Sequence, residues 1–127
     1  MVESLLSQGR LSTMNERRDK CELLPGTLDM LILRTVVLGP AHGHQIAKHI
    51  QRSTADVLQV EHGSLYPALH RLERKGWLAS KWESRDGKRE FKYYRLSAAG
   101  RKQLRVEESK WKVLVDAIAQ VAALAEG

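Results

Sequence analysis

The side chains that could do chemistry gather in the run from Ser64 to Gly76. They offer a hydroxyl, an aromatic ring, an imidazole and two guanidinium groups, on Ser64, Tyr66, His70, Arg71 and Arg74. A guanidinium binds a guanine edge or a phosphate through two parallel hydrogen bonds, and a helix N-terminus favours phosphate through its free N–H groups. The run is therefore a candidate surface for binding double-stranded DNA.

The same run has the signals of one helix. Ser64 is the expected N-cap, Pro67 falls in the expected first turn, and Gly76 lies where a C-cap glycine belongs. Helical spacing puts Leu65, Ala68, Leu69 and Leu72 on a core face and leaves the opposite face to Tyr66, Pro67, His70, Arg71 and Arg74. One buried face and one free face are what a recognition helix needs in the major groove of DNA.

Two helices should precede this one and position it. Thr27 is the expected N-cap of an apolar helix that begins at Leu28 and ends before Gly39-Pro40. A second, shorter helix is expected roughly from His44 to Arg52.

A hairpin and a long helix should follow. Alternating residues predict strands over 78–83 and 90–96, joined by a loop that contains Asp86-Gly87, a hairpin signal. Ser97 should cap a last helix that reaches about Ala125. Three small helices and a hairpin predict a mainly α, α+β fold: a winged helix-turn-helix with a long C-terminal helix. We expect a flexible tail over 1–22, the DNA-binding domain over 23–97 and a dimerisation helix over 98–127.

Charge supports a polyanionic partner. The chain has a formal net charge of +6 and a pI of about 9.7. Residues 70–95 contain nine Lys or Arg residues and four acids, so most of the excess lies on the expected recognition helix and hairpin. The hairpin loop, with Lys88 and Arg89, is suited to lie along phosphates or to enter a minor groove.

Apolar residues of the last helix recur at heptad spacing, which predicts that two copies pair through this helix. These residues are Leu104, Trp111, Val115, Ile118 and Ala122. Trp111 has two interpretations: a tryptophan packed in the dimer seam, or one wall of a pocket for a small aromatic or cationic effector. Trp77 and Trp82 are expected to pack at the base of the hairpin.

Other function classes find little support in the sequence. The five histidines lack metal-ligand spacing and a partner set of cysteines or carboxylates, so no metal site or cofactor is expected. No nucleophile motif, phosphate-binding glycine loop or paired acid and base predicts an enzyme. The single cysteine excludes an internal disulfide, and no apolar run predicts a membrane span or a secretory signal. We expect a cytoplasmic protein that joins the nucleoid when bound to DNA, with no membrane partner.

Four stretches of the sequence resemble the PadR family of transcription regulators, over about residues 23–125. They are the stretches 24–33 (LPGTLDMLIL), 43–46 (GHQI), 63–73 (GSLYPALHRLE) and 93–101 (YYRLSAAGR). The single C-terminal helix is similar to that of the short PadR subgroup. The chain departs from the family pattern in its long N-terminal segment and in His44, where many relatives carry tyrosine.

The resemblance implies a repressor that binds an inverted repeat as a homodimer. It also implies that a small aromatic or cationic compound can bind the protein and release it from DNA, as in some members of the family. It implies DNA contacts by the hairpin residues Lys88 and Arg89 and by five residues of the recognition helix. These five are Ser64, Tyr66, Pro67, His70 and Arg71. An alternative stays open at this point: a dimer that kept the winged fold for protein interaction and does not recognise a DNA sequence.

Overall fold

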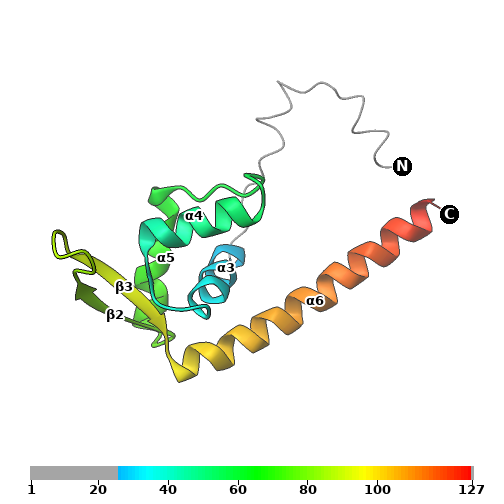
Figure 1. Cartoon of the computed structure of the whole chain (residues 1–127). Coiled ribbons are helices and arrows are strands. Elements are labelled where there is room, and N and C mark those ends of the chain that lie inside the picture. The colour runs from blue at the N-terminus through cyan, green and yellow to red at the C-terminus, as the bar shows by residue number, and fades with distance from the viewer. Residues whose placement is uncertain (1–25, 127) are drawn as a thin grey trace.

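The computed structural model describes residues 26–126, with side chains to Leu124. The expected tail, residues 1–22, therefore lies outside the described residues. The described elements follow in the order helix α3, strand β1, helices α4 and α5, strands β2 and β3, and helix α6 (Figure 1). The α+β class and the order of a winged helix-turn-helix with a long last helix are confirmed.

Helix α3 (Thr27–Val36) supplies the centre of the core. Ile32 and Leu33 are fully buried, and the chain leaves the helix through Gly39, whose φ of 147° favours glycine. The expected N-cap is wrong by one residue. Gly26 occupies the cap position with no side-chain hydrogen bond, and Thr27 is already helical.

Helix α4 (Gly43–Ser53) follows a two-residue strand, β1 (Ala41–His42), that the sequence did not predict. Ile46 and Ile50 bury one face of α4 against the core. The turn to the next helix is held by Thr54, whose hydroxyl donates to the carbonyl of Ile50 and accepts from the N–H of Leu58.

Helix α5 (His62–Arg74) begins three residues earlier than expected, with Glu61 and not Ser64 at the cap position. The carbonyl of Glu61 accepts from the N–H groups of Ser64 and Leu65, at 3.0 and 2.9 Å, so Ser64 lies in the first turn and is not the N-cap. Pro67 consequently lies inside the helix rather than in its first turn, and its missing N–H leaves the carbonyl of Gly63 without its i+4 donor.

The C-terminal end of α5 is as expected. Gly76 has a φ of 80°, its N–H donates to the carbonyl of Glu73, and the N–H of Trp77 donates to that of Leu72. These two bonds form a Schellman motif, which a glycine in this left-handed conformation permits. The chain therefore turns directly into the first strand of the hairpin.

The hairpin consists of β2 (Leu78–Glu83) and β3 (Phe91–Leu96), and β1 adds a third antiparallel strand in the order β1-β3-β2. The pairing joins Leu78 to Leu96 and Glu83 to Phe91. In Figure 1 the far end of the hairpin projects beyond the helices, as a wing does.

Helix α6 (Ala98–Glu126) begins at the predicted cap, where the Ser97 hydroxyl accepts from the N–H of Gly100 at 3.0 Å. Its first turns pack on α3. Leu104 is 6% exposed and belongs to the core of the winged domain, so the expectation that it forms part of a dimer surface is wrong. Beyond Glu108, which pairs with Arg34 at 3.1 Å, the helix extends away from the domain (Figure 1).

Candidate nucleic-acid interface

The exposed face of α5 carries most of the residues that the sequence assigned to DNA. Leu65, Leu69 and Leu72 are fully buried beneath it, which fixes the rotation of the helix. The residues exposed on the other side are Ser64, Tyr66, Pro67, His70 and Arg74. The structure therefore places these five on one accessible surface.

Arg71 lies at the border of this face rather than within it. Its Nη2 atom is 2.6 Å from Oδ1 of Asp29 in α3, and 43% of its side chain is exposed. The ion pair holds the guanidinium beside α3, whereas the sequence predicted that it lies on the free face of α5. No local pattern predicts this pairing, because the two residues lie on helices whose relative position only the fold sets.

Tyr66 lies against the start of α4. A β-carbon built on Gly43 would come within 2.8 Å of the Tyr66 ring, closer than real β-carbons approach other atoms. The tyrosine is 39% exposed, so one side of its ring contacts α4 while the rest stays accessible. Glycine at position 43 thus lets Tyr66 occupy this place.

A row of rings continues from Tyr66 to the hairpin. The ring centroids of Tyr66 and His62 are 5.6 Å apart, those of His62 and His44 6.2 Å, and those of His44 and His42 6.4 Å. The His42 ring stacks on Phe91 of β3 at 4.5 Å. The row therefore runs from the N-terminal end of α5, past the start of α4, to strand β3 of the hairpin.

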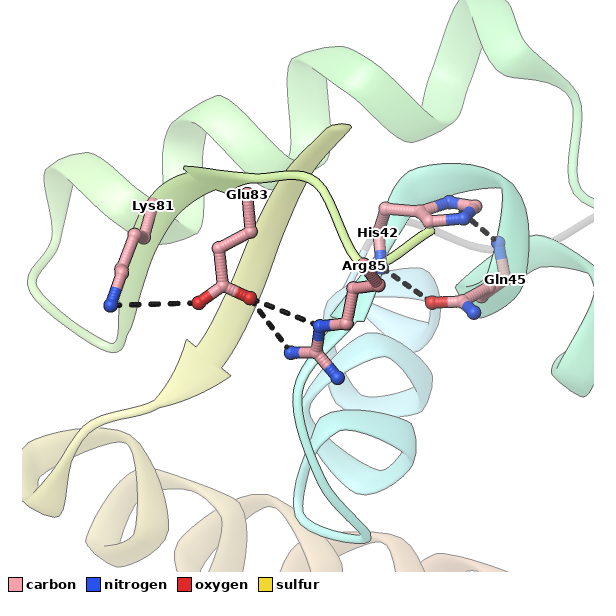
Figure 2. Close-up of polar contacts among 5 residues, drawn as sticks. All are labelled: His42, Gln45, Lys81, Glu83 and Arg85. Atoms are coloured by element: carbon pink, nitrogen blue, oxygen red, sulfur yellow. Dashed lines mark hydrogen bonds and ion pairs between the residues drawn. The ribbon is translucent and has the colours of Figure 1, made fainter. Parts of the chain in front are cut away.

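His42 also caps α4. Its Nδ1 atom accepts from the N–H of Gln45 at 3.4 Å, and its own N–H donates to Oε1 of Gln45 at 3.0 Å (Figure 2). Burial, and then the nearby His44, lower the pKa of His42. The neutral ring is the form that this cap requires, since a protonated Nδ1 cannot accept.

Glu73 ties α5 to the hairpin. Its carboxylate accepts from the hydroxyl of Ser80 at 2.5 Å and lies 3.3 Å from Nζ of Lys92. The Ser80 hydrogen bond and the Lys92 charge outweigh burial and lower the pKa of Glu73. Both strands of the hairpin are thereby fixed to one side chain of α5, which sets the angle between the hairpin and that helix.

The tip of the hairpin is organised by Asp86. Its carboxylate accepts from the N–H groups of Lys88 and Arg89, at 2.9 and 3.3 Å, and these bonds lower the pKa of Asp86. Gly87, between Asp86 and Lys88, has a φ of 76°. Asp86 therefore serves the backbone of the turn, and both basic side chains remain exposed beside it.

Glu83 neutralises part of the charge at the base of the tip. Its carboxylate lies 3.5 Å from Lys81 and 2.9 Å from Arg85, and the Arg85 hydrogen bond lowers its pKa (Figure 2). Arg85 also lies over the ring of Tyr93, at 4.2 Å. Among the described residues, Arg74, Lys88 and Arg89 have no acidic partner within ion-pair distance, so their charges are available to an anion.

The far part of α6 exposes a broad apolar surface. Trp111, Val115 and Ile118 are 38%, 47% and 59% exposed, and Ala122 is exposed as well. Heptad spacing did not single out the further exposed apolar residues beside them: Val113, Leu114, Val121 and Leu124. The surface is therefore wider than the predicted stripe.

Two further features bear on ligands. An open groove of about 590 Å³ lies between α4 and the loop after α3, with His44, Lys48 and Arg52 in its lining, and Trp111 is not part of it. Over residues 26–126 there is no group of three or more potential metal ligands, and no helix there is long and apolar enough to cross a membrane.

Comparison with known proteins agrees with this geometry. A family model described as "Transcriptional regulator PadR-like family" matches residues 32–106. An uncharacterised protein from Lysinibacillus sphaericus is 30% identical over 94 residues, which cover 72% of this chain and 84% of that protein.

Solved structures are similar too. A PadR family transcriptional regulator from Eggerthella lenta is 31% identical, with a TM-score of 0.66 over 93% of this chain and 96% of its own. A transcriptional regulator from Clostridium thermocellum is 26% identical, with a TM-score of 0.69 over 75% of this chain and 89% of its own.

Proposed function

Because the chain belongs to the PadR-like family of transcriptional regulators, we propose that it represses transcription by binding a pseudo-palindromic promoter site as a homodimer. Members of this family are regulators and not enzymes, and membership implies DNA binding. One observation carries the proposal furthest: the exposed face of α5 and the tip of the hairpin both present cations that lack an acidic partner among the described residues.

In the proposed complex α5 enters the major groove and the hairpin lies on the adjoining backbone or minor groove. Ser64, Tyr66, Pro67 and His70 face base edges, while Arg71 and Arg74 border them. Lys88 and Arg89 contact phosphates, with Arg89 also able to enter a narrow minor groove. The Glu73 contacts support this arrangement, because they hold helix and hairpin at one angle.

Two copies are proposed to pair through α6. Residues 23–97 then act as the DNA-binding domain and residues 98–127 as the dimerisation helix. The apolar side chains of Trp111, Val115, Ile118 and Ala122 support pairing, since they are exposed in the single chain. Two α5 helices should lie roughly 34 Å apart, one turn of DNA, when both bind one face of the duplex.

An effector would act through the dimer seam. A flat aromatic or cationic compound that stacks on Trp111 would release DNA if it favours another separation of the two α5 helices. Quenching of Trp111 fluorescence by such a compound, with weaker DNA binding in its presence, is the expected result. If compounds that quench Trp111 leave the affinity for DNA unchanged, the effector is removed from the proposal.

The experiment that tests DNA recognition is selection from a random-sequence duplex pool by the purified full chain. We expect enrichment of an inverted repeat, and two protomers per selected duplex by analytical ultracentrifugation. A promoter fusion that carries the selected site should be less active when the protein is present. Failure to enrich any sequence, with the dimer intact, would leave the alternative of a winged-helix dimer for protein interaction.

A further inference from the structure

Trp82 is a large side chain that the described residues leave mostly exposed. The sequence predicted that it packs at the base of the hairpin, but 62% of it is exposed, and that expectation is wrong. Trp77 does pack against the core. An exposed indole offers a partner both a large apolar face and an N–H donor, which is why tryptophan is enriched at interfaces.

The strand register gives the place of this side chain. Trp82 pairs with Lys92 and is two residues from Ser80, which pairs with Tyr94. Alternate residues of a strand point to the same face, so Trp82 shares the face of Ser80 and Lys92. That face is turned toward α5, because Ser80 and Lys92 both contact Glu73. The indole thus stands on the α5 side of the hairpin, two residue pairs nearer the tip than Ser80.

The surroundings of Trp82 are basic. Lys92 shares its face but pairs with Glu73, and Lys81 belongs to the opposite face, beside Glu83. Lys88 and Arg89, which have no acidic partner within ion-pair distance among the described residues, follow at the tip. A polyanion with an apolar component fits such a surface better than an apolar protein face does. A second copy paired through the far part of α6 would not cover it, because the hairpin and that end of α6 lie at opposite ends of the molecule (Figure 1).

We propose that the Trp82 indole packs against a deoxyribose of the DNA strand that passes between α5 and the hairpin. This inference rests on the proposed function. When a helix occupies the major groove and a hairpin reaches the next minor groove, the sugar–phosphate backbone that separates the grooves runs between them. Deoxyribose carbons offer that strand's apolar surface.

A sugar contact makes three predictions that separate it from other roles. It carries no sequence information, so its loss weakens binding to selected and scrambled duplexes by the same factor. It neutralises no phosphate, so the salt dependence of binding is unchanged. Burial of about half an indole corresponds to a loss of about tenfold in affinity for each protomer bound.

The test variant is Trp82→Thr, which removes the ring and keeps a residue that favours strands. Trp82→Phe keeps a ring, and Leu38→Ala truncates another exposed apolar residue, 66% exposed, in the loop after α3. Affinities are measured over a salt series on a duplex selected by the wild-type chain and on its scrambled sequence. We expect Trp82→Thr to lose about tenfold per protomer on both duplexes at an unchanged salt slope, while Trp82→Phe loses less and Leu38→Ala nothing.

A second readout uses the wild-type sequence labelled with 5-fluorotryptophan, whose fluorine signals are assigned by single Trp→Phe variants. The Trp82 signal should shift when either duplex is added, and the Trp77 signal should not. An unmoved Trp82 signal and an unchanged Trp82→Thr affinity, on duplexes that the wild type binds, would overturn the inference alone. A loss confined to the selected duplex would also overturn it, in favour of a base contact. A wild-type chain that binds neither duplex would overturn the proposed function itself.

Discussion

Gly43 and Tyr66 are in such close contact that position 43 has no room for a β-carbon, which would lie 2.8 Å from the tyrosine ring. The contact joins the first residue of α4 to the exposed face of α5. The place of a residue proposed to contact bases is therefore set by the absence of a side chain on the neighbouring helix.

Gly43→Ala should displace the Tyr66 ring and weaken specific DNA binding. The ring is the far end of a flexible side chain, so we expect the thermal midpoint to change little while the affinity for a selected duplex falls. In a Tyr66→Ala background the same substitution should have no further effect on affinity, because the clash is gone. An equal loss in both backgrounds would show that Gly43 acts independently of Tyr66.

Arg71 and Arg74 should separate stability from DNA binding. Arg71→Ala removes the ion pair with Asp29 and should lower the free energy of unfolding, by up to about 1 kcal/mol for so exposed a pair. Arg74→Ala should leave that free energy unchanged and reduce the slope of log affinity against log salt by about one. Urea unfolding and a salt series measure the two. A stability loss from Arg74→Ala, or none from Arg71→Ala, would contradict the assignment.

The His42 cap should make stability depend on pH. Because the folded-state pKa of His42 is lowered from 6.5, its contribution is present above about pH 6.5 and is lost as pH falls through the folded-state pKa. His42→Asn keeps a capping side chain that does not titrate. We therefore expect the free energy of unfolding, measured with urea, to fall more between pH 7.5 and pH 5 in the wild type than in His42→Asn, by about 1 kcal/mol or less. Equal losses in the two proteins would refute a role for His42 protonation.

Ala55 stores backbone strain in the turn between α4 and α5. Its φ is 50°, in the left-handed region that favours glycine, and Asp56 follows at 68°. Ala55→Gly should raise the free energy of unfolding by roughly 0.5 kcal/mol, since relief of strain exceeds the added freedom of the unfolded chain. The matched control, Ala99→Gly in the first turn of α6, should lower it. If both substitutions lower it, position 55 is unstrained.

Local signals in the sequence predicted the parts of the fold that depend on near neighbours. Gly76 ends α5, Asp86-Gly87 turns the hairpin and Ser97 caps α6, each within a few residues. Strand β1 was missed because two residues, Ala41 and His42, have no detectable periodicity. They become a strand only by pairing with Tyr94 and Tyr93.

The errors at α5 and α6 have different causes. At α5 the hydroxyl of Ser64 suggested a cap, whereas the Glu61 carbonyl starts the helix without any side-chain bond. At α6 the heptad spacing treated Leu104 and Trp111 alike. Only the packing of α6 on α3 separates a core leucine from an exposed tryptophan.

The candidate site was predictable in its residue types and only partly in its contacts. The exposed positions on α5 and at the hairpin tip followed from helical and hairpin geometry. The Asp29–Arg71 pair and the Glu73–Ser80 bond join separate elements, as does the approach of Gly43 to Tyr66, so no local pattern indicates them.

The most direct test of sequence recognition is the ratio of affinities for a selected and a scrambled duplex, measured for wild type and Tyr66→Ala at about 150 mM salt. Specific regulators bind their sites about a thousandfold or more tighter than unrelated DNA. We expect a wild-type ratio of that order. In Tyr66→Ala the ratio should fall, mainly because the affinity for the selected duplex falls. A wild-type ratio near one would contradict sequence recognition, because the basic surface of α5 and the hairpin would then bind DNA without recognising its sequence.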